Sequence, residues 1–431
     1  MLLHADWVLP IASPPIRDGA VVTKGHHIAA VGTREELVRA NPTEPITRHD
    51  GCVMLPGLVN GHTHLALTAL HEILPSAPFH EWVPLLVRAM RALTDDDLAI
   101  SSVLGAHRAI ASGTTLVGEI AYGPESPAIA ADTGLGGTFF WEVLGIAADD
   151  LDKQLKSLEY PSDLERYESA RQRHGLTAHS PYTSGPGLLA AVHGHAIGHN
   201  TGFAIHVAES PAEVELLRDG TGPLADIATR TATGFTAPGV SPVRYLADLG
   251  VLDRALAVHC AEILPTDAPL LASHAAGAVL CPRSNAFLHV GPAPVDSLVR
   301  SGVTLALGTD SLASNHDFDL FAEARALRQR SSLLSSERII KMMTAEGARA
   351  LGLDDTFGTL AAGKQADLAL FQVDGGSDPY TALVDQGGRS TVVAVMTAGL
   401  WRVLNGQATF PSRFAESAVR HAAVRAAIAI Q

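Results

Sequence analysis

LPGLVNGHTH, at residues 55–64, carries an apolar, strand-like run into two histidines that are separated by a single residue. On a β-strand, residues i and i+2 point to the same side, so His62 and His64 can direct both imidazoles at one metal ion. An isolated pair of this kind also fits two surface histidines in a turn. The segment therefore predicts a metal site only if the rest of the chain supplies further ligands.

Seven further apolar runs follow this segment and alternate with longer, helix-like stretches up to about residue 360. They read TTLVGEI, GGTFFWEVLG, GLTAHSPY, FAIHVAE, LAVHCAE, AVLCPRSN and VTLALGTD. Eight strands that alternate with helices favour a parallel (β/α)8 barrel of the TIM type, which takes roughly 250 residues. We therefore expect an α/β fold in which residues 56–360 form the catalytic barrel. Catalytic groups in such a barrel project from the carboxyl ends of the strands.

The two ends of the chain carry a different pattern. Residues 1–55 read as short strands and turns, and ADLALFQV and VVAVMTAGLWRVLNG near the other end have the same character. We expect residues 1–55 and 361–415 to build one smaller β-sandwich domain beside the barrel. The last segment, 416–431, is helix-prone and amphipathic, and we expect a helical tail that packs on its own domain.

The composition of the 431 residues limits the partners of this protein. A formal net charge of −14 leaves no basic surface for nucleic acid or anionic lipid. The three cysteines are widely spaced, which is typical of a reducing compartment, and no apolar run is long enough to cross a bilayer. We expect a cytoplasmic enzyme with a small-molecule substrate, without nucleic-acid or membrane partners, for which a homodimer would be ordinary.

Two further candidate metal ligands close apolar runs, where a core residue would normally be apolar. His206 ends FAIH and Asp310 ends VTLALGTD. Together with His62 and His64 they offer three imidazoles and one carboxylate, a ligand set that suits zinc or iron(II) and leaves a position for water. A single buried aspartate is often a helix cap, but four candidates at strand ends favour the metal site.

His179 and His259 also lie at strand ends, in GLTAHSPY and LAVHC. Each could be a hydrogen-bonded core histidine, but the repetition at strand ends favours a role in the pocket. GLTAHSPY contains no lysine that could bridge two metals after modification. We therefore expect one metal ion.

PGLVNGHTH, HVAE, HC, CPRSN and LGTDSLAS together resemble the successive signatures of the amidohydrolase superfamily, in its branch of metal-dependent deaminases and chlorohydrolases. GTLAAGKQADLALF resembles that family's return from the barrel to its β domain, so the resemblance covers nearly the whole chain. It implies that one divalent metal, zinc or else iron(II), is held by His62, His64, His206 and Asp310. It also implies that Glu209 is the proton-handling acid, that His259 contacts the attacking hydroxide, and that Asp310 relays the water proton to the leaving amine.

WEVLG, AHSPYT and CPRSN resemble the branch that deaminates 6-aminodeoxyfutalosine in menaquinone biosynthesis. This substrate combines an adenine ring, a deoxyribose and a benzoate. We expect Trp82 to pack against it and, by analogy with adenosine-type deaminases, His179 to hydrogen-bond the purine. Arg283 is the expected partner of the carboxylate, because arginine binds carboxylates bidentately. A structural salt bridge at the barrel mouth is the alternative for Arg283.

Several other activities fit the same site. Arg91 stands nine positions after Trp82, where deaminases of S-adenosylhomocysteine and methylthioadenosine are expected to carry a ribose-binding glutamate. This difference disfavours those two substrates without excluding them, and other amino-heterocycles, amides or carbon–chlorine bonds are further alternatives. A non-enzymatic alternative is an inert scaffold that kept the barrel, against which the complete ligand set with Glu209 argues.

Overall fold

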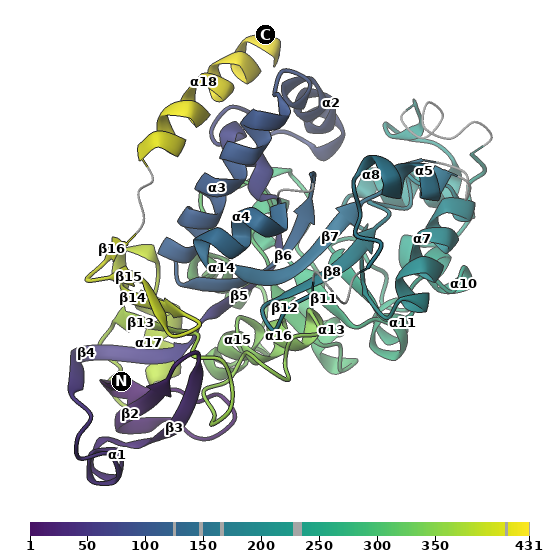
Figure 1. Cartoon of the computed structure of the whole chain (residues 1–431). Helices are drawn as coiled ribbons and strands as arrows, with labels where there is room; N and C mark the ends of the chain where they lie inside the picture. Colours follow the sequence, from purple (N-terminus) through teal and green to yellow (C-terminus); the bar gives the residue numbers. More distant parts are fainter. Residues whose placement is uncertain (124–125, 146–149, 164–167, 227–234, 410–412, 431) are drawn as a thin grey trace.

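The computed structural model describes residues 1–123, 126–145, 150–163, 168–226, 235–409 and 413–430, which form a barrel joined to a smaller β domain (Figure 1). Eight parallel strands lie in one sheet in the order in which they occur in the chain. These strands are β5 (Leu58–Thr63), β6 (Thr114–Ala121), β7 (Gly136–Glu142), β8 (Gln172–Thr177), β9 (Gly202–Val207), β10 (Ala255–His259), β11 (Gly277–Leu280) and β12 (Leu305–Leu307).

The first and the last strand of this sheet meet, and their contact closes the barrel. Thr63 and Asp310 form a parallel bridge, and the backbone N–H of Asp310 donates to the carbonyl oxygen of His62 at 3.0 Å. The predicted (β/α)8 barrel is thereby confirmed. Closure also brings the carboxylate that follows the last strand next to the histidines of the first.

The interior of the barrel is a packed core and not a channel, as expected for this fold. Val59, Leu116, Phe140, Val258 and Val279 come from five different strands and belong to one buried cluster. Because alternate residues of a strand face opposite sides, their neighbours in sequence face the surrounding helices. The polar residues at the carboxyl ends of the strands are therefore the first side chains above this core that can meet around the barrel axis.

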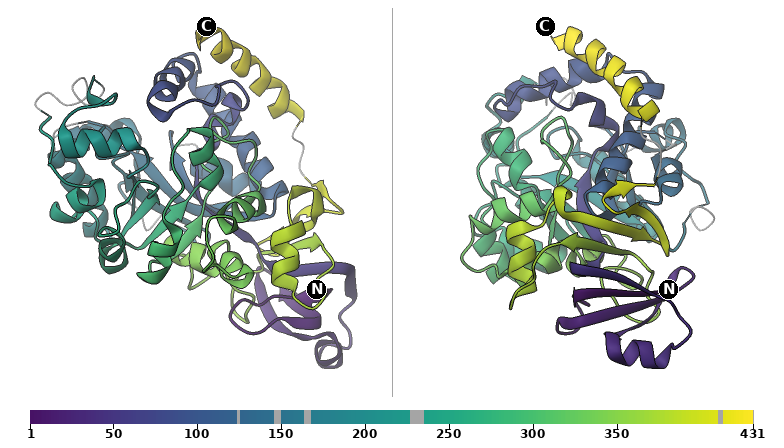
Figure 2. Two further views of the ribbon diagram at one scale, coloured as in Figure 1. Left: turned by 180° about the vertical axis from the view of Figure 1, so that it is seen from behind. Right: turned by 90° about the vertical axis from the view of Figure 1, so that its left-hand side faces the viewer.

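Helices surround the barrel strands on the outside (Figures 1 and 2). They are α3 (Asp95–Ala111), α4 (Ser126–Thr133), α5 (Asp150–Ser157), α7 (Pro186–Gly198), α8 (Pro211–Asp219), α10 (Pro242–Asp248), α11 (Ala268–His274), α12 (Pro282–Phe287), α13 (Val295–Arg300), α14 (Leu320–Arg328), α15 (Ser336–Met342) and α16 (Ala345–Ala350), with the 3-10 helix η1 (Leu65–Leu70) directly after β5. None of the described helices combines the length and the apolar character that crossing a bilayer requires.

Two helices stand apart from the regular barrel. Helix α2 (Phe79–Met90) is inserted between η1 and α3, and α18 (Arg413–Ile430) packs against α2, α3 and η1 (Figures 1 and 2). The guanidinium of Arg425 pairs with the carboxylate of Asp97 at the start of α3. The C-terminal helix thus begins three residues before the expected tail at 416–431, whose last residue, Gln431, lies outside the described residues.

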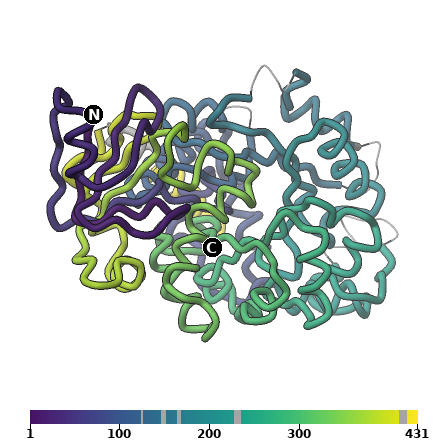
Figure 3. Tube along the Cα trace, turned by 90° about the horizontal axis from the view of Figure 1, so that it is seen from below, coloured from purple at the N-terminus to yellow at the C-terminus, as the bar shows by residue number. Residues whose placement is uncertain are grey.

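The smaller domain is built from both chain ends, as the sequence predicts (Figure 3). Its strands form one mixed sheet in the order β16-β15-β14-β13-β4-β1-β2-β3. They are β1 (Leu2–Val8), β2 (Ile16–Lys24), β3 (His27–Thr33), β4 (Ile46–Pro56), β13 (Leu368–Gln372), β14 (Val392–Thr397), β15 (Leu400–Leu404) and β16 (Gln407–Ala408), with α1 (Arg34–Ala40), α17 (Pro379–Gln386) and η2 (Arg389–Thr391) in the connections. On β13, Leu368 and Leu370 face the core of this domain, whereas Ala369 and Phe371 pack with the barrel cluster.

Candidate active site

Four side chains from three strand ends converge above the barrel core. The Nε2 atom of His62 lies 3.1 Å from Nε2 of His64 and 3.2 Å from Nε2 of His206. One carboxylate oxygen of Asp310 lies 3.6 Å from the same atom of His62 and 3.5 Å from Nε2 of His64. All four residues are buried. The structure thus brings together the four residues that the sequence nominates as metal ligands.

This arrangement fits a divalent metal ion. Two nitrogens that each lie 2.0–2.1 Å from a tetrahedral zinc ion are about 3.3 Å apart, close to the separations of His62 from His64 and His206. Among the described residues, His62, His64 and Asp310 form one group whose ligand atoms lie within 4.8 Å of one another, and His62, His206 and His259 form a second. Burial, and after it the charge of His62, lowers the pKa of His64 to about 3, and burial likewise holds the pKa of His206 well below its ordinary value. The imidazoles of His64 and His206 are therefore neutral, which is the form that binds a metal.

The outer atoms of these ligands are held by neighbouring groups, as is usual around metal sites. Nδ1 of His64 lies 2.9 Å from the hydroxyl of Tyr122, and Nδ1 of His206 lies 3.0 Å from the carbonyl oxygen of His179. The second carboxylate oxygen of Asp310 accepts a hydrogen bond from the hydroxyl of Ser284 at 2.6 Å. These contacts fix the orientation of each ligand before a metal binds.

Asp310 keeps its negative charge in spite of its burial. Burial acts to raise its pKa, but hydrogen bonding to His62 and the charges of His64 and His259 outweigh it and hold the pKa well below the usual range. The backbone N–H of Ser311 also donates to its first carboxylate oxygen at 2.7 Å. Asp310 is consequently ionised, the form in which a carboxylate can bind a metal or accept a proton.

Glu209 and His259, the residues expected to handle protons, lie next to each other in the site. Nε2 of His259 lies 3.4 Å from a carboxylate oxygen of Glu209, and its Nδ1 lies 3.1 Å from the side-chain oxygen of Asn285. Burial, and after it the charges of Asp310 and Glu213, raises the pKa of Glu209 well above its ordinary value. Burial therefore favours the protonated form of Glu209, which is the form that can donate a proton.

The position of Glu209 follows from the sequence SPAE that succeeds it. Ser210 is the N-cap of α8 and Pro211 stands in its first turn, a typical helix start. The carboxylate of Glu213, in that turn, accepts the backbone N–H groups of Ala208 and Glu209 at 2.9 and 2.8 Å. These hydrogen bonds fix the loop between β9 and α8 to the first turn of α8.

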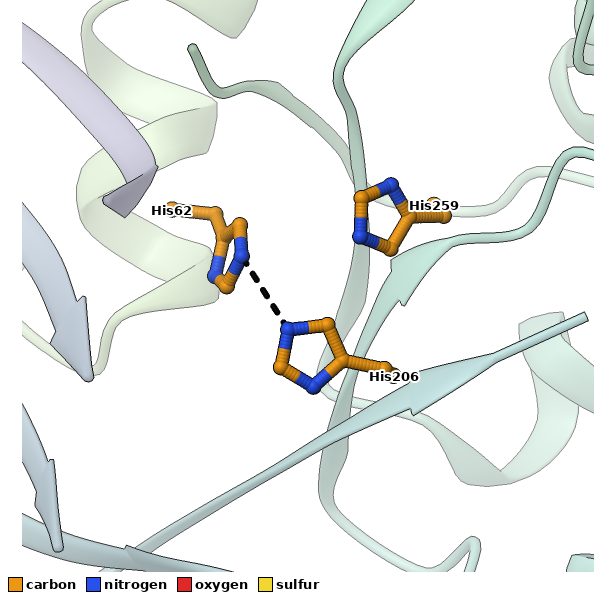
Figure 4. Close-up of side chains that lie close together, drawn as sticks. All are labelled: His62, His206 and His259. Carbon is orange, nitrogen blue, oxygen red and sulfur yellow. Dashed lines mark hydrogen bonds between the residues drawn. The ribbon is translucent and has the colours of Figure 1, made fainter. Parts of the chain in front are cut away.

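The three histidines of Figure 4 come from different strands and point toward one another. The ring centroids of His62 and His259 are 5.7 Å apart, and those of His206 and His259 are 5.4 Å apart. His259 can therefore contact a group bound at the cluster, in agreement with the role that the resemblance implies.

The backbone is strained at this site. His179, His259 and Asp310 adopt positive φ angles of 56°, 72° and 59°. Residues other than glycine rarely adopt this conformation, which costs of order 1–3 kcal/mol each, and such residues gather at functional sites. The surrounding structure offsets this cost and holds the three side chains in an orientation that an ordinary strand end would not provide.

A cavity of about 500 Å³ opens above the cluster. It is lined by His64, Leu67, Phe79, Trp82, Val83, Leu86, Val87, Met90, Arg91, Tyr122, Glu142, Leu144, His179, Tyr182, Thr183, His206, Glu209, His259, Leu288, Asp310 and Ser311. Helix α2 supplies its apolar wall. Ligand pockets typically measure about 300–1,000 Å³ and are mostly apolar with a few polar groups, so this cavity suits a small organic molecule.

Trp82 and His179, two of the expected substrate contacts, both line the cavity. The indole N–H of Trp82 is buried and has no hydrogen-bond partner in the described part of the chain, so it can donate to a ligand as well as pack against it. Nδ1 of His179 lies 2.7 Å from the hydroxyl of Thr183, and burial lowers the pKa of His179 to about 4. A neutral imidazole held in this way leaves Nε2 for the ligand.

Arg283, the third expected substrate contact, does not line this cavity. Its guanidinium donates to Asp317 at 2.6 Å and lies 3.7 Å from Glu323, and its backbone N–H also donates to Glu323 at 2.9 Å. The expected contact with a substrate carboxylate is therefore corrected to a structural ion pair. The reason is that α12 begins at Pro282 and turns this side chain toward α14.

Sequence reasoning missed several polar groups of the site. Glu119 accepts the hydroxyl of Thr63 at 2.5 Å and the backbone N–H of Leu65 at 2.9 Å, and so holds the loop that carries His64. Glu142 lines the cavity. Glu142 ends an apolar strand, the same signal that identified His206, whereas Glu119 lies within β6, two residues before its end. A single carboxylate at such a position is ambiguous without knowledge of its neighbours in space.

The chain matches the amidohydrolase family over residues 53–402. An aminodeoxyfutalosine deaminase from Deinococcus radiodurans is 33% identical over 348 residues, which cover 78% of this chain and 81% of the relative. A 5-methylthioadenosine/S-adenosylhomocysteine deaminase from Moorella thermoacetica is 30% identical over 381 residues, 86% of this chain and 85% of the relative.

Two solved structures share the fold. An adenosine deaminase from Xanthomonas campestris with bound zinc has a TM-score of 0.83 and 24% identity, with 99% of this chain and 98% of that one covered. The Helicobacter pylori aminofutalosine deaminase in complex with methylthio-coformycin has a TM-score of 0.79 and 20% identity, with 93% and 99% covered. With the match over most of the chain and relatives at 30% identity or more, this protein belongs to the amidohydrolase family of hydrolytic enzymes.

Proposed function

We propose that this protein is a zinc-dependent hydrolytic deaminase of aminopurine nucleosides, with 6-aminodeoxyfutalosine as its preferred substrate. The observation that carries the proposal is the position of Glu209, a carboxyl group with a raised pKa, beside the His/Asp cluster under a cavity of nucleoside size. The reaction replaces the ring amino group by oxygen from water and releases ammonia.

A divalent metal at the cluster would lower the pKa of water from 15.7 to about 7 and so supply a nucleophile at neutral pH. The residues provide the remaining proton transfers. Glu209 gives its proton to the ring nitrogen next to the carbon under attack and is protonated again by one of the two protons of water. Asp310, which is ionised, accepts the other proton of water and passes it to the leaving amine. His259, 3.4 Å from Glu209, stabilises the negative charge that develops on oxygen.

The choice of zinc follows from the ligands and from the neighbours. Three imidazoles and one carboxylate suit zinc and iron(II), and the structurally similar Xanthomonas deaminase contains zinc. We propose one zinc ion per chain, held by His62, His64, His206 and Asp310.

The relatives divide between two substrate classes, since one is an aminodeoxyfutalosine deaminase and others are methylthioadenosine/adenosylhomocysteine deaminases. Arg91 favours the first class. It directly follows α2, and among the described residues that line the cavity it is the only lysine or arginine. 6-Aminodeoxyfutalosine ends in a benzoate, and we assign its carboxylate to Arg91 in place of Arg283.

A panel of amino-heterocycles scored for ammonia tests the proposed reaction. We expect the highest kcat/KM for 6-aminodeoxyfutalosine, with lower values for adenosine, methylthioadenosine and S-adenosylhomocysteine. A chlorotriazine and a simple amide, assayed for chloride and for amine, cover the competing hydrolyses. Failure to release ammonia from any aminopurine by the metal-loaded protein would refute the proposal.

Replacing Arg91 by Met should lower kcat/KM for 6-aminodeoxyfutalosine about 10- to 100-fold, the usual loss for one hydrogen bond to a charged group. Turnover of adenosine, which carries no carboxylate, should change less than about threefold, because that contact is absent. Arg88→Met, an exposed position on the same helix outside the cavity, is the matched control. An equal loss on both substrates would remove Arg91 from carboxylate recognition.

A further inference from the structure

Glu142 is a partly buried acidic group that the proposed reaction does not use. It is the last residue of β7, and its side chain lines the cavity. Phe140, two residues earlier, belongs to the interior core of the barrel, whereas Trp141 between them packs in the outer core. Because side chains alternate along a strand, Glu142 points to the barrel axis as Phe140 does.

One carboxylate oxygen of Glu142 is fully buried and has no hydrogen-bond partner among the residues that the structure describes. Glu142 also belongs to neither group of potential metal ligands in those residues. Burial raises the pKa of Glu142 to about 7. A buried polar group without a hydrogen-bond partner destabilises the folded protein, and a ligand that donates a hydrogen bond to the free oxygen removes this cost.

The surroundings of Glu142 indicate which part of a ligand it meets. The metal cluster with Glu209 takes the reacting end of the ring, and Leu144, two residues beyond Glu142, also lines the cavity but is 46% exposed. The wall that carries Glu142 therefore leads toward solvent at Leu144, and the group attached to the ring would extend along it. A carboxylate accepts hydrogen bonds with both oxygens and repels anions, so it suits adjacent hydroxyl groups and not a carboxylate.

We propose that Glu142 is the specificity-determining residue that accepts hydrogen bonds from the hydroxyl groups of the substrate's sugar. This inference rests on the proposed function for the placement of the ring. It divides the recognition of the substrate between two walls: Glu142 on β7 binds the neutral sugar, and Arg91 after α2 binds the anionic end.

Adenosine and 2′,3′-dideoxyadenosine test this inference, because they differ only in the hydroxyl groups. Binding is measured by calorimetry on Glu209→Gln, in which turnover is expected to be about 10²–10⁴-fold slower, and on the double variant Glu209→Gln/Glu142→Ala. We expect Glu209→Gln to bind adenosine about 10- to 100-fold more tightly than the dideoxy compound, as for hydrogen bonds to a charged group. In the double variant the ratio should fall to within about threefold, through weaker binding of adenosine alone.

Several outcomes separate this inference from the proposed function. An unchanged ratio in the double variant would overturn the role of Glu142, even if the wild-type protein deaminates adenosine. No deamination by the wild-type protein, together with a ratio that depends on Glu142, would overturn only the deaminase proposal. If neither nucleoside binds, both fail.

Glu142→Gln, which keeps the shape of the side chain, is a second variant that distinguishes a lost contact with the ligand from a disturbed fold. The melting temperature of Glu142→Gln and Glu142→Ala should equal or exceed that of the parent, since each removes an unsatisfied buried carboxyl group. A structural role would instead lower the melting temperature and weaken the binding of both nucleosides alike, which would also overturn the inference.

Discussion

Replacing Glu209 by Gln is expected to lower kcat by about 10²–10⁴-fold, the usual contribution of a general acid–base group. The amide has the same size, but it cannot transfer a proton to the ring nitrogen. The backbone N–H of Glu209, which donates to Glu213 at 2.8 Å, is unaffected by the change. Metal content should therefore stay at the parental level, as measured by elemental analysis beside steady-state kinetics.

Glu215→Gln is the matched control, because Glu215 lies on α8 outside the cavity and should keep full activity. If Glu209→Gln retained turnover within about twofold of the parent, Glu209 would have no part in the chemistry, given the expected contribution.

Replacing His206 by Ala should remove most of the bound metal and lower kcat/KM by more than about 100-fold, since loss of even an outer partner of a metal ligand typically costs 10–100-fold. His206 comes from β9, on the far side of the cluster from His62 of β5 and from His64, which directly follows β5. Its loss leaves the remaining ligands on one side of the metal. Elemental analysis after dialysis, together with ammonia release, measures both effects.

His199→Ala provides the control for this variant, because His199 is an exposed histidine at the end of α7. Full metal occupancy with normal turnover in His206→Ala would show that the cluster is not the metal site. A further check is thermal: added zinc should raise the melting temperature of the parent protein, because a ligand that binds only the folded state stabilises it, and should raise that of His206→Ala much less.

The barrel strands and the metal-ligand candidates could be read from the sequence because both signals are local. An apolar run that ends in a polar residue, such as FAIH before His206 or VTLALGT before Asp310, predicts a buried strand and a group at its carboxyl end without knowledge of any neighbour. The spacing of His62 and His64 places both imidazoles on one side of a strand. The parallel barrel then follows from the alternation of strands and helices.

Recognition of the substrate depends on contacts that no local pattern contains. Arg283 has its two acidic partners 34 and 40 positions later in the chain, so the sequence could not decide between a substrate contact and an internal ion pair. From the sequence, Arg91 differs from the glutamate expected in related enzymes, but nothing in the local pattern places it at the cavity. Its place on the cavity follows from the packing of α2 over the strand ends, with α18 behind it.

The amino-acid sequence alone therefore determined the strands, the composite β domain and the nominated ligands, since these depend on apolar periodicity and on short spacings. Tertiary structure decided which strand-end groups meet. The Thr63–Asp310 bridge closes the barrel and brings the carboxylate of Asp310 next to the histidines at the end of β5. The direction of β7 points Glu142 into the cavity. Pairing between distant strands fixes their register, and register decides whether a polar side chain faces the axis or the surrounding helices.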